Sequence, residues 1–313
     1  MIFFVPQRVR ETAAGFGAAG ALWLEELPAR IAAIEEAWSL TAGRVFDTDG
    51  QVSWVAPVRL AEGSEAVLKI SIPHPEARRE ADALRFFEGR GAVRLLRASE
   101  DGFSLLIERC VPGTNLWSLG VEEGNAAGAA VLRRLWREPS SSQKAKGKRQ
   151  KSEFRFDSSA FCLLPFALLT DLAAEWCESL PRTAPGAGYD TGLVSDAVAL
   201  ARELAETQPR TVLLHGDFHP SNVLAAVREP WLAIDCKPLV GDPAYDLAQW
   251  LGNRCEAVER SPDAVSILRR QIDQFGDLLG LEPARIAGWA FVKSLGWDWG
   301  APVARLLRAA IDG

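Results

Sequence analysis

The segment around Asp217 restricts the possible folds of this chain more than any other stretch. Asp217 belongs to a His-Gly-Asp triplet, and Asn222 follows five residues later. Two short apolar runs, 223–225 and 231–234, then flank a turn, and Asp235 follows the second run at once. This pattern predicts a β-hairpin that carries polar residues at its open end.

The open end of this hairpin brings oxygen-bearing side chains together. Asn222 precedes the first strand and Asp235 follows the second, so both lie at the same end. An amide oxygen and a carboxylate suit Mg²⁺, whose other ligands can be phosphate and water. An Asp followed five residues later by an Asn is also the spacing of the kinase catalytic loop. The segment therefore indicates phosphoryl transfer, with Asp217 as the catalytic carboxylate and with Asn222 and Asp235 as metal ligands.

Each of these residues has an ordinary structural explanation when it is taken alone. Asp217 can cap a helix or occupy a turn, and Asn222 can occupy a turn before a strand. Asp235 is harder to explain, because a carboxylate at the end of a buried strand is costly without a partner. Clustered carboxylates at strand ends tend to be functional, so the three residues together favour the catalytic interpretation.

The first part of the chain offers the strand lysine that such chemistry requires. Kinases use this lysine to hold the α- and β-phosphates, and a helix glutamate to hold the lysine. Lys69 lies in a predicted strand at 66–70, and a helix is predicted after it. Glu80 lies on the apolar face of that helix and needs a cation. We expect Lys69 to pair with Glu80, with Glu76 one turn away as the rival.

Hydrophobic patterning divides the chain into a helical extension over 1–40, a strand-rich lobe over 41–110 and a mostly helical lobe over 111–313. Pro28 is expected to break the extension into two helices. The strand-rich lobe is predicted to have strands at 45–47, 52–58, 66–70, 93–97 and 103–108, and a helix at 75–88. The sequence thus predicts a bilobal α+β fold with an antiparallel sheet and one helix in the first lobe.

The basic segment 139–153 differs from the rest of the chain, because it is polar and almost free of apolar residues. Its composition favours a flexible, solvated insert over an anion-binding tail.

Composition excludes several other classes of protein. A net charge of −6 disfavours nucleic-acid binding and is compatible with a cationic small molecule. Five cysteines without a Cys-x-x-Cys pair disfavour a disulfide framework or a zinc site. The opening apolar run ends at Pro6, and no run is long enough to span a bilayer. We expect a cytoplasmic protein that does not bind membranes, as either a monomer or a dimer.

These motifs resemble those of the aminoglycoside phosphotransferase superfamily, which is protein-kinase-like. More narrowly, they resemble the streptomycin 6-phosphotransferase and hydroxyurea phosphotransferase branch. The resemblance covers roughly residues 40–300. It is carried by VSWVAPVRLAEGSEAVLKI, EARREADALRFFEGRGAVRLL, LLIERCVPG, HGDFHPSNVL and AIDCKPLVGDPAYDLAQWLGNR.

The resemblance implies a two-lobed protein-kinase-like fold that binds ATP and Mg²⁺ in a cleft. It implies that Lys69, steadied by Glu80, holds phosphate, and that Glu108 to Cys110 form a hinge along the adenine through backbone groups. The chain departs from the protein-kinase pattern at 48–51, where a turn with one glycine replaces a GxGxxG loop. A second departure is the Cys-Lys dipeptide that follows Asp235 in place of Phe-Gly.

Two further groups of residues have both a structural and a functional interpretation. Asp242 and Asp246 are expected to support the catalytic loop through hydrogen bonds, in preference to binding the acceptor. Residues 297–299 (Trp-Asp-Trp) can bind a guanidinium or ammonium substrate, although a buried helix anchor is slightly favoured.

Three functional classes follow from these residues. The first is a kinase that phosphorylates a hydroxyl of an aminoglycoside or hydroxyurea-type antibiotic. The second is a kinase of a metabolic alcohol, such as a sugar or an amino alcohol. The third is a non-catalytic pseudokinase, which the joint presence of Lys69, Asp217, Asn222 and Asp235 disfavours. The sequence specifies neither the acceptor nor the choice between ATP and GTP.

Overall fold

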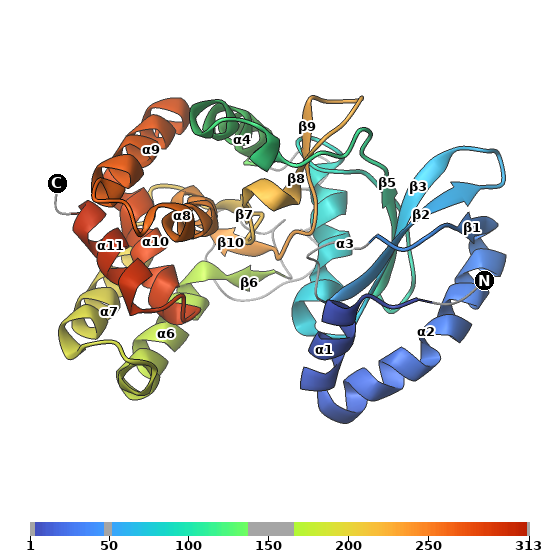
Figure 1. The fold of residues 1–313 in the computed structure, drawn as a ribbon, viewed down its shortest axis with the longest axis horizontal. Coiled ribbons are helices and arrows are strands. Elements are labelled where there is room, and N and C mark those ends of the chain that lie inside the picture. The colour runs from blue at the N-terminus through green and yellow to red at the C-terminus, as the bar shows by residue number, and fades with distance from the viewer. Residues whose placement is uncertain (1–3, 47–51, 137–165, 312–313) are drawn as a thin grey trace, which may run out of the picture. The chain divides into compact units, whose positions relative to one another are not determined.

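A computed structural model describes residues 4–46, 52–136 and 166–311 of the chain. The predicted turn at 48–51 and the basic insert at 139–153 lie outside these residues. The chain divides into two compact units, drawn in Figure 1. One comprises Met1–Gly113 with Ala226–Arg228, and the other comprises Thr114–Ala225 with Glu229–Gly313.

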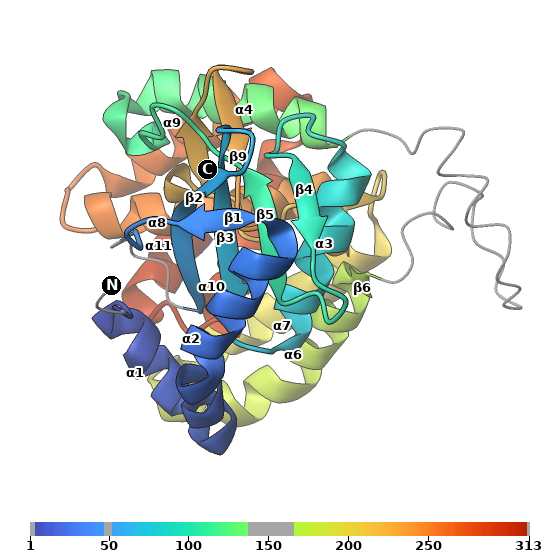
Figure 2. The same ribbon diagram turned by 90° about the vertical axis from the view of Figure 1, so that its right-hand side faces the viewer.

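The first unit is built on a five-stranded antiparallel sheet in the order β1-β2-β3-β5-β4. Its elements are α1 (Gln7–Gly15), α2 (Gly17–Trp38), β1 (Leu40–Ala42), β2 (Ser53–Leu60), β3 (Glu65–Ser71), α3 (Pro75–Phe87), β4 (Leu95–Ala98) and β5 (Ser104–Glu108). Side chains alternate along β3, so that Leu68 and Ile70 pack with Leu27 of α2 on one face. Lys69 points to the other face and meets α3. Figure 2 shows α2 running along the sheet.

The N-terminal helices separate at Phe16, and the predicted break at Pro28 is wrong. Helix α2 continues through Pro28, although a proline inside a helix costs about 3 kcal/mol. Trp23, Leu27 and Ile31 on the same helix are buried, and each such side chain contributes about 1.5–3 kcal/mol, which outweighs that cost. The separation falls at Phe16 because Gly17, with φ +59°, reverses the chain there.

The prediction of a strand at 45–47 is also wrong. The first strand, β1, lies earlier, at Leu40–Ala42, and its last pair with β2 is Ala42 opposite Val58. The next position of β2 is Pro57, which accepts from Gly43 N–H at 2.8 Å but has no N–H to donate in return. The regular ladder therefore ends before residue 45. The other predicted strands and the helix of this unit are present, with ends shifted by up to two residues.

The second unit combines short strands with long helices. Its strands are β6 (Ala167–Leu168), β7 (Val212–Leu214), β8 (Val223–Ala225), β9 (Trp231–Ala233) and β10 (Leu239–Gly241). Its α-helices are α4 (Val121–Leu135), α6 (Leu169–Thr183), α7 (Thr191–Glu206), α8 (Asp246–Val258), α9 (Ala264–Leu279), α10 (Pro283–Gly296) and α11 (Ala301–Ile311). Short 3₁₀ turns are η1 (Leu116–Ser118), η3 (Ala184–Ala187), η4 (Pro220–Asn222) and η5 (Pro243–Tyr245). Strands β6, β10 and β7 form one sheet, and β8 and β9 form the hairpin.

Helix α10 forms the centre of this unit, in contact with α7, α8, α9 and α11. Its residues from Ile286 to Leu295 are all buried. A helix that is buried on all sides cannot shift without disturbing its neighbours, so α10 is a rigid support for the residues that contact it. Within the described parts of the chain, no helix has both the length and the apolar character needed to cross a membrane.

Candidate active site

The β8–β9 hairpin places Asn222 and Asp235 at one end, as the sequence predicts. Val223 pairs with Ala233, and Ile234 N–H donates to Asn222 O at 2.9 Å. Asp235 is the next residue and has a left-handed backbone with φ +59°. Asp tolerates this conformation better than most residues, because its short polar side chain can form local hydrogen bonds. The chain therefore turns away from the hairpin directly at the proposed metal ligand.

The loop between β7 and the hairpin is fixed by the buried carboxylate of Asp246, the first residue of α8. It accepts hydrogen bonds from His215 N–H at 3.0 Å, Gly216 N–H at 2.8 Å and the Trp136 indole N–H at 2.8 Å. Burial raises the pKa of Asp246, although these donors and the nearby His215 act in the opposite direction. This carboxylate supports the catalytic loop in the way predicted for it.

Gly216 is required where this loop meets the segment after Asp235. Its φ is +80°, and a Cβ at this position would lie 1.8 Å from Lys237 O. Lys237 N–H donates to His215 O at 2.8 Å on the same crossing. A side chain cannot fit between two backbones at this separation, so glycine lets Asp217 and the Asp235 segment approach each other.

The buried imidazole of His215 connects the loop to the hairpin in its neutral form. Its Nδ1 accepts from Asp217 N–H at 3.3 Å, and its Nε2 lies 2.9 Å from Ile234 O. Since Nδ1 acts as an acceptor and Nε2 faces a carbonyl, the proton is assigned to Nε2. Burial lowers the pKa of His215, which favours this neutral tautomer.

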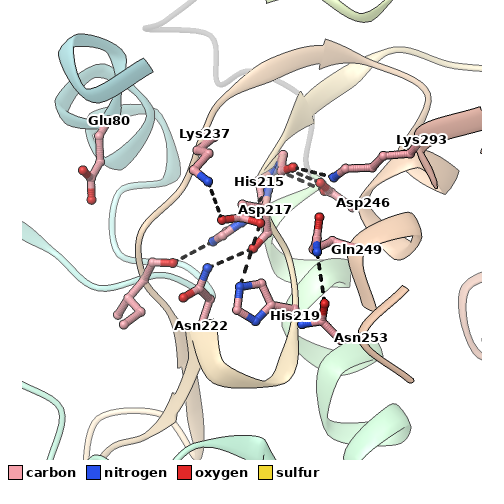
Figure 3. Close-up of polar contacts among 12 residues, drawn as sticks. Glu80, His215, Asp217, His219, Asn222, Lys237, Asp246, Gln249, Asn253 and Lys293 are labelled. Carbon is pink, nitrogen blue, oxygen red and sulfur yellow. Dashed lines mark hydrogen bonds and ion pairs between the residues drawn. The ribbon is translucent and has the colours of Figure 1, made fainter. Parts of the chain in front are cut away.

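The side chain of Asp217 lies beside Lys237 and His219 (Figure 3). Its Oδ2 lies 2.8 Å from Lys237 Nζ, and its Oδ1 lies 3.9 Å from His219 Nε2. Burial raises the pKa of Asp217, but Lys237, His219 and Lys293 together outweigh it, so the pKa lies below its ordinary value. Asn222 Nδ2 donates to the Asp217 backbone carbonyl at 3.0 Å. The carboxylate is therefore ionised and held in place at neutral pH.

In the first unit, Lys69 and Glu80 form a buried ion pair. Lys69 Nζ lies 2.6 Å from Glu80 Oε2, and the two side chains are only 7% and 3% exposed. Glu76, which the sequence left as a rival, is exposed in the first turn of α3. The strand and the helix thus form the lysine–glutamate pair that we expected.

The side chains of the predicted hinge are engaged within the first unit. Glu108 accepts from Arg228 Nε and Nη2, both at 2.8 Å, and from Arg94 N–H at 3.0 Å. Burial raises the pKa of Cys110 to about 12, with a further contribution from Glu108, so the thiol is neutral. A hinge over Glu108–Cys110 stays a prediction, and the Glu108 N–H is already used, since it donates to Arg94 O at 2.9 Å.

Asp242 has a different partner from Asp246. Its Oδ2 accepts from Arg285 Nε at 2.8 Å and from the Trp289 indole N–H at 2.9 Å. Both donors belong to α10, so Asp242 anchors that helix and does not reach the catalytic loop or His215, contrary to our expectation. The structural interpretation still holds, because a fully buried carboxylate with these partners is not available to an acceptor.

The Trp-Asp-Trp segment is only partly an anchor. Trp299 packs against Gly252, where a Cβ would lie 2.4 Å from the indole ring. Trp297 is 50% exposed, and Asp298 accepts from the Tyr189 hydroxyl at 3.0 Å. Trp299 is half-buried, and Trp297 and Asp298 are exposed, so the expected buried anchor holds only in part, at Trp299.

Three residues near Asp217 were not identified from the sequence. Lys237 and His219 face its carboxylate, and Lys293 Nζ donates to Gly216 O at 3.1 Å while lying 4.7 Å from the Tyr245 ring centroid. A signal existed for Lys293, because it is a lone lysine within the apolar run of α10. Lys237 lies only two residues after Asp235, but spacing alone does not show that its side chain turns toward Asp217.

Comparison with known proteins agrees with this geometry. The aminoglycoside/hydroxyurea antibiotic resistance kinase family matches residues 37–146 and 159–297. Streptomycin 6-kinase of Streptomyces glaucescens is 35% identical over 91% of this chain and 87% of its own length. Hydroxyurea phosphotransferase of Kitasatospora aureofaciens is 36% identical over 90% of this chain and 76% of its own length.

A solved structure shows the same fold. Aminoglycoside phosphotransferase APH(4)-Ia in a ternary complex with AMP-PNP and hygromycin B superposes with a TM-score of 0.54 at 16% identity. The match covers 90% of this chain and 98% of that one. The fold and the site thus define a small-molecule kinase of the bilobal protein-kinase-like class. Within that class, the chain belongs to the aminoglycoside/hydroxyurea antibiotic resistance kinase family.

Proposed function

We propose that this chain transfers the γ-phosphoryl group of ATP to a hydroxyl group of a streptomycin-like aminoglycoside or a hydroxyurea-type compound, in the cytoplasm. The names of its relatives support this choice of acceptor. One observation supports the chemistry most strongly. The ionised carboxylate of Asp217 lies on a loop fixed by Asp246, beside the hairpin end that carries Asn222 and Asp235.

Asp217 has one carboxylate oxygen for the acceptor hydroxyl. Its Oδ2 is occupied by Lys237 at 2.8 Å, whereas Oδ1 lies 3.9 Å from His219 Nε2, which is longer than a hydrogen bond. The acceptor O–H would donate to Oδ1. The new O–P bond forms as the bond to ADP breaks, and the hydroxyl proton passes to Asp217 late, because its lowered pKa makes it a weak base.

Asn222 and Asp235 are the proposed Mg²⁺ ligands. The Asn222 amide N–H is used by the Asp217 carbonyl, which leaves its oxygen as a ligand atom. Among the residues that the structure describes, no group of three or more His, Cys, Asp or Glu side chains could hold a metal ion. The remaining ligands would then be phosphate oxygens and water, which is the usual manner of Mg²⁺ binding. When bound, Mg²⁺ neutralises charge on the phosphates.

The first unit is proposed to hold the nucleotide. Lys69 would bind the α- and β-phosphates, and its buried pair with Glu80 holds the ammonium in one place on β3. Backbone groups of Glu108 to Cys110 would bind the adenine. In this proposal, residues 41–110 serve the nucleotide, residues 111–313 serve the acceptor, and residues 1–40 are an added extension.

A phosphorylation screen with Mg·ATP tests the proposal. Streptomycin, hydroxyurea and amino alcohols such as choline are offered as acceptors, with GTP in parallel and Asp217→Ala as the control. We expect a phosphate ester of streptomycin or hydroxyurea, detected by mass spectrometry, with the wild type alone. A product from amino alcohols only would support the metabolic alternative. Nucleotide binding without any turnover would contradict the proposed activity.

A further inference from the structure

Arg254, on α8, is a buried cation with two guanidinium nitrogens that lack a hydrogen-bonding partner among the residues that the structure describes. The residue is 6% exposed, and neither Nε nor Nη2 finds an acceptor within the described part of the chain. Burial lowers the pKa of Arg254. A buried guanidinium that lacks a counter-charge is costly, so the contacts around it call for an explanation.

The contact that Arg254 makes leaves the N–H groups of Nε and Nη2 without an acceptor among the described residues. The guanidinium carbon lies 4.4 Å from the centroid of the Trp117 ring, in a cation–π contact. Such a contact covers a face of the guanidinium, whereas its N–H groups point outward in the plane. The Trp117 indole N–H donates to Ser221 Oγ at 2.9 Å, and Ser221 directly precedes Asn222. Arg254 is thereby linked to the catalytic loop through a single indole.

The first turn of α4 adds a second source of unpaired donors beside Arg254. This helix has 15 residues, and its N-cap residue, Gly120, provides no side-chain cap. The N–H groups of a first turn have no partner inside the helix. Gly124, the fourth residue of α4, faces the arginine, since a Cβ there would lie 3.6 Å from Arg254 Nη2. Its own N–H donates to Gly120 O at 2.8 Å, so the first-turn donors without an intrahelical partner are those of residues 121–123. The first-turn acids Glu122 and Glu123 are exposed, and no ion pair joins either of them to Arg254.

We propose that Arg254, Ser221 and the uncapped first turn of α4 form a binding site for a small oxyanion, a phosphate or a carboxylate group. An anion there would accept from the in-plane guanidinium N–H groups and from a helix N-terminus, which are the two arrangements that proteins use for such groups. Ser221 accepts from Trp117 and retains its own O–H as a donor. Trp117 is 39% exposed, so the indole over the guanidinium is accessible from solvent. The inference does not depend on the proposed phosphoryl transfer.

Isothermal titration calorimetry with inorganic phosphate tests the site in the full-length protein, with sodium chloride at matched ionic strength as the blank. We expect saturable binding to the wild type, and at least 10-fold weaker binding to Arg254→Met. Arg260→Met removes an exposed arginine near the end of α8 and should bind phosphate like the wild type. AMP-PNP binding, measured alongside, should be equal in both variants. Absent saturation in the wild type, or equal phosphate affinity in Arg254→Met, would overturn the proposal.

A second variant keeps Arg254 and therefore tests the site even if Arg254→Met fails to fold. Gly120 has the extended backbone of an N-cap, and a Cβ there would meet nothing within 4 Å. Gly120→Asp supplies the missing cap, so this variant should be more heat-stable than the wild type and bind phosphate at least 10-fold more weakly. Unchanged phosphate affinity in a stabilised Gly120→Asp would count against the site. Acetate as a second titrant separates a carboxylate site from a phosphate-selective one.

Discussion

Two lysine–carboxylate pairs, one in each unit, differ in how deeply they are buried. Lys69 and Glu80 meet at 2.6 Å, with side chains 7% and 3% exposed, on a strand and a helix. Lys237 and Asp217 meet at 2.8 Å, with side chains 37% and 16% exposed, on loops. Regular elements hold the first pair, whereas the second can exchange its partners for solvent or a substrate.

This difference has an energetic consequence. In a buried pair, loss of one partner leaves a charge that water cannot reach, at a cost of about 3–5 kcal/mol. In a partly exposed pair, water replaces the lost partner, and the cost is about 1 kcal/mol or less. The fixed pair, Lys69–Glu80, therefore suits a group that must hold its position. The exchangeable pair, Lys237–Asp217, suits a group that must release a partner when a hydroxyl arrives.

The largest expected effect is on turnover, when the carboxylate of the exchangeable pair is removed. Asp217→Ala should lower kcat about 10²–10⁴-fold, because the acceptor hydroxyl loses its hydrogen-bond acceptor and proton acceptor. AMP-PNP binding, measured by calorimetry, should change little. Asp217→Asn is the isosteric control and should be similarly inactive. An Asp217→Ala enzyme with wild-type kcat would remove Asp217 from the mechanism.

The next effect is on stability, when the fixed pair is broken. Glu80→Gln should lower the free energy of unfolding by about 3–5 kcal/mol, because Lys69 is left as a buried charge without its carboxylate. Urea denaturation measures the change. Glu76→Gln, on the exposed side of the same helix, should change it by less than about 0.5 kcal/mol. Equal effects of the two substitutions on the free energy of unfolding would show that the pair with Glu80 does not stabilise the fold.

A smaller effect is expected at Gly216, where the loop that carries Asp217 crosses the segment that carries Lys237. Gly216→Ala places a Cβ 1.8 Å from Lys237 O, in addition to the cost of its positive φ. Gly188→Ala is the matched control, since Gly188 has φ +85° and open space around its Cβ. The control should lose about 1–2 kcal/mol of unfolding free energy, from the backbone conformation alone. Gly216→Ala should lose more and should also lower kcat.

Two largely buried histidines near Asp217 should also make the second unit sensitive to acid. Burial lowers the pKa of both His215 and His219, so the unfolded chain takes up protons first as pH falls below about 6.5. Stability should be full above that value and should decline by up to about 1.4 kcal/mol per pH unit for each histidine. Urea titrations from pH 8 to pH 5 measure the slope. His215→Gln should flatten it, because one of the two largely buried imidazoles is then removed.

The smallest expected effect on stability is the loss of Lys237 itself. Lys237→Met should change the free energy of unfolding by about 1 kcal/mol or less, because the pair is partly exposed. Its effect on kcat should exceed its effect on KM for ATP, since Lys237 bonds Asp217 directly. Lys237→Arg should restore part of kcat, which a purely structural role would not require. A large loss of stability in Lys237→Met would mean that the pair is fixed like Lys69–Glu80.

The hairpin and its end residues could be predicted because strand pairing is local. Val223 and Ala233 are close in sequence, and their register alone places Asn222 beside Asp235. Glu80 could be predicted as the partner of Lys69 for the same reason, since a carboxylate on the apolar face of a nearby helix needs a cation. Pro28 and the strand at 45–47 were mispredicted because packing of α2 and the missing N–H of Pro57 overrode local preference.

What the sequence by itself determined is the set of groups that lie close together along the chain: Asn222 with Asp235 at the ends of one hairpin, and Lys69 with Glu80 on a strand and the helix that follows it. Only the tertiary structure decided which side chains surround Asp217, that Asp246 holds its loop while Asp242 holds α10, and that Arg254 is buried with no carboxylate of the described residues paired to it. Most of these contacts join residues that are far apart in the chain, often through backbone atoms. Side-chain identity carries little information about such contacts, because every residue has the same N–H and C=O groups.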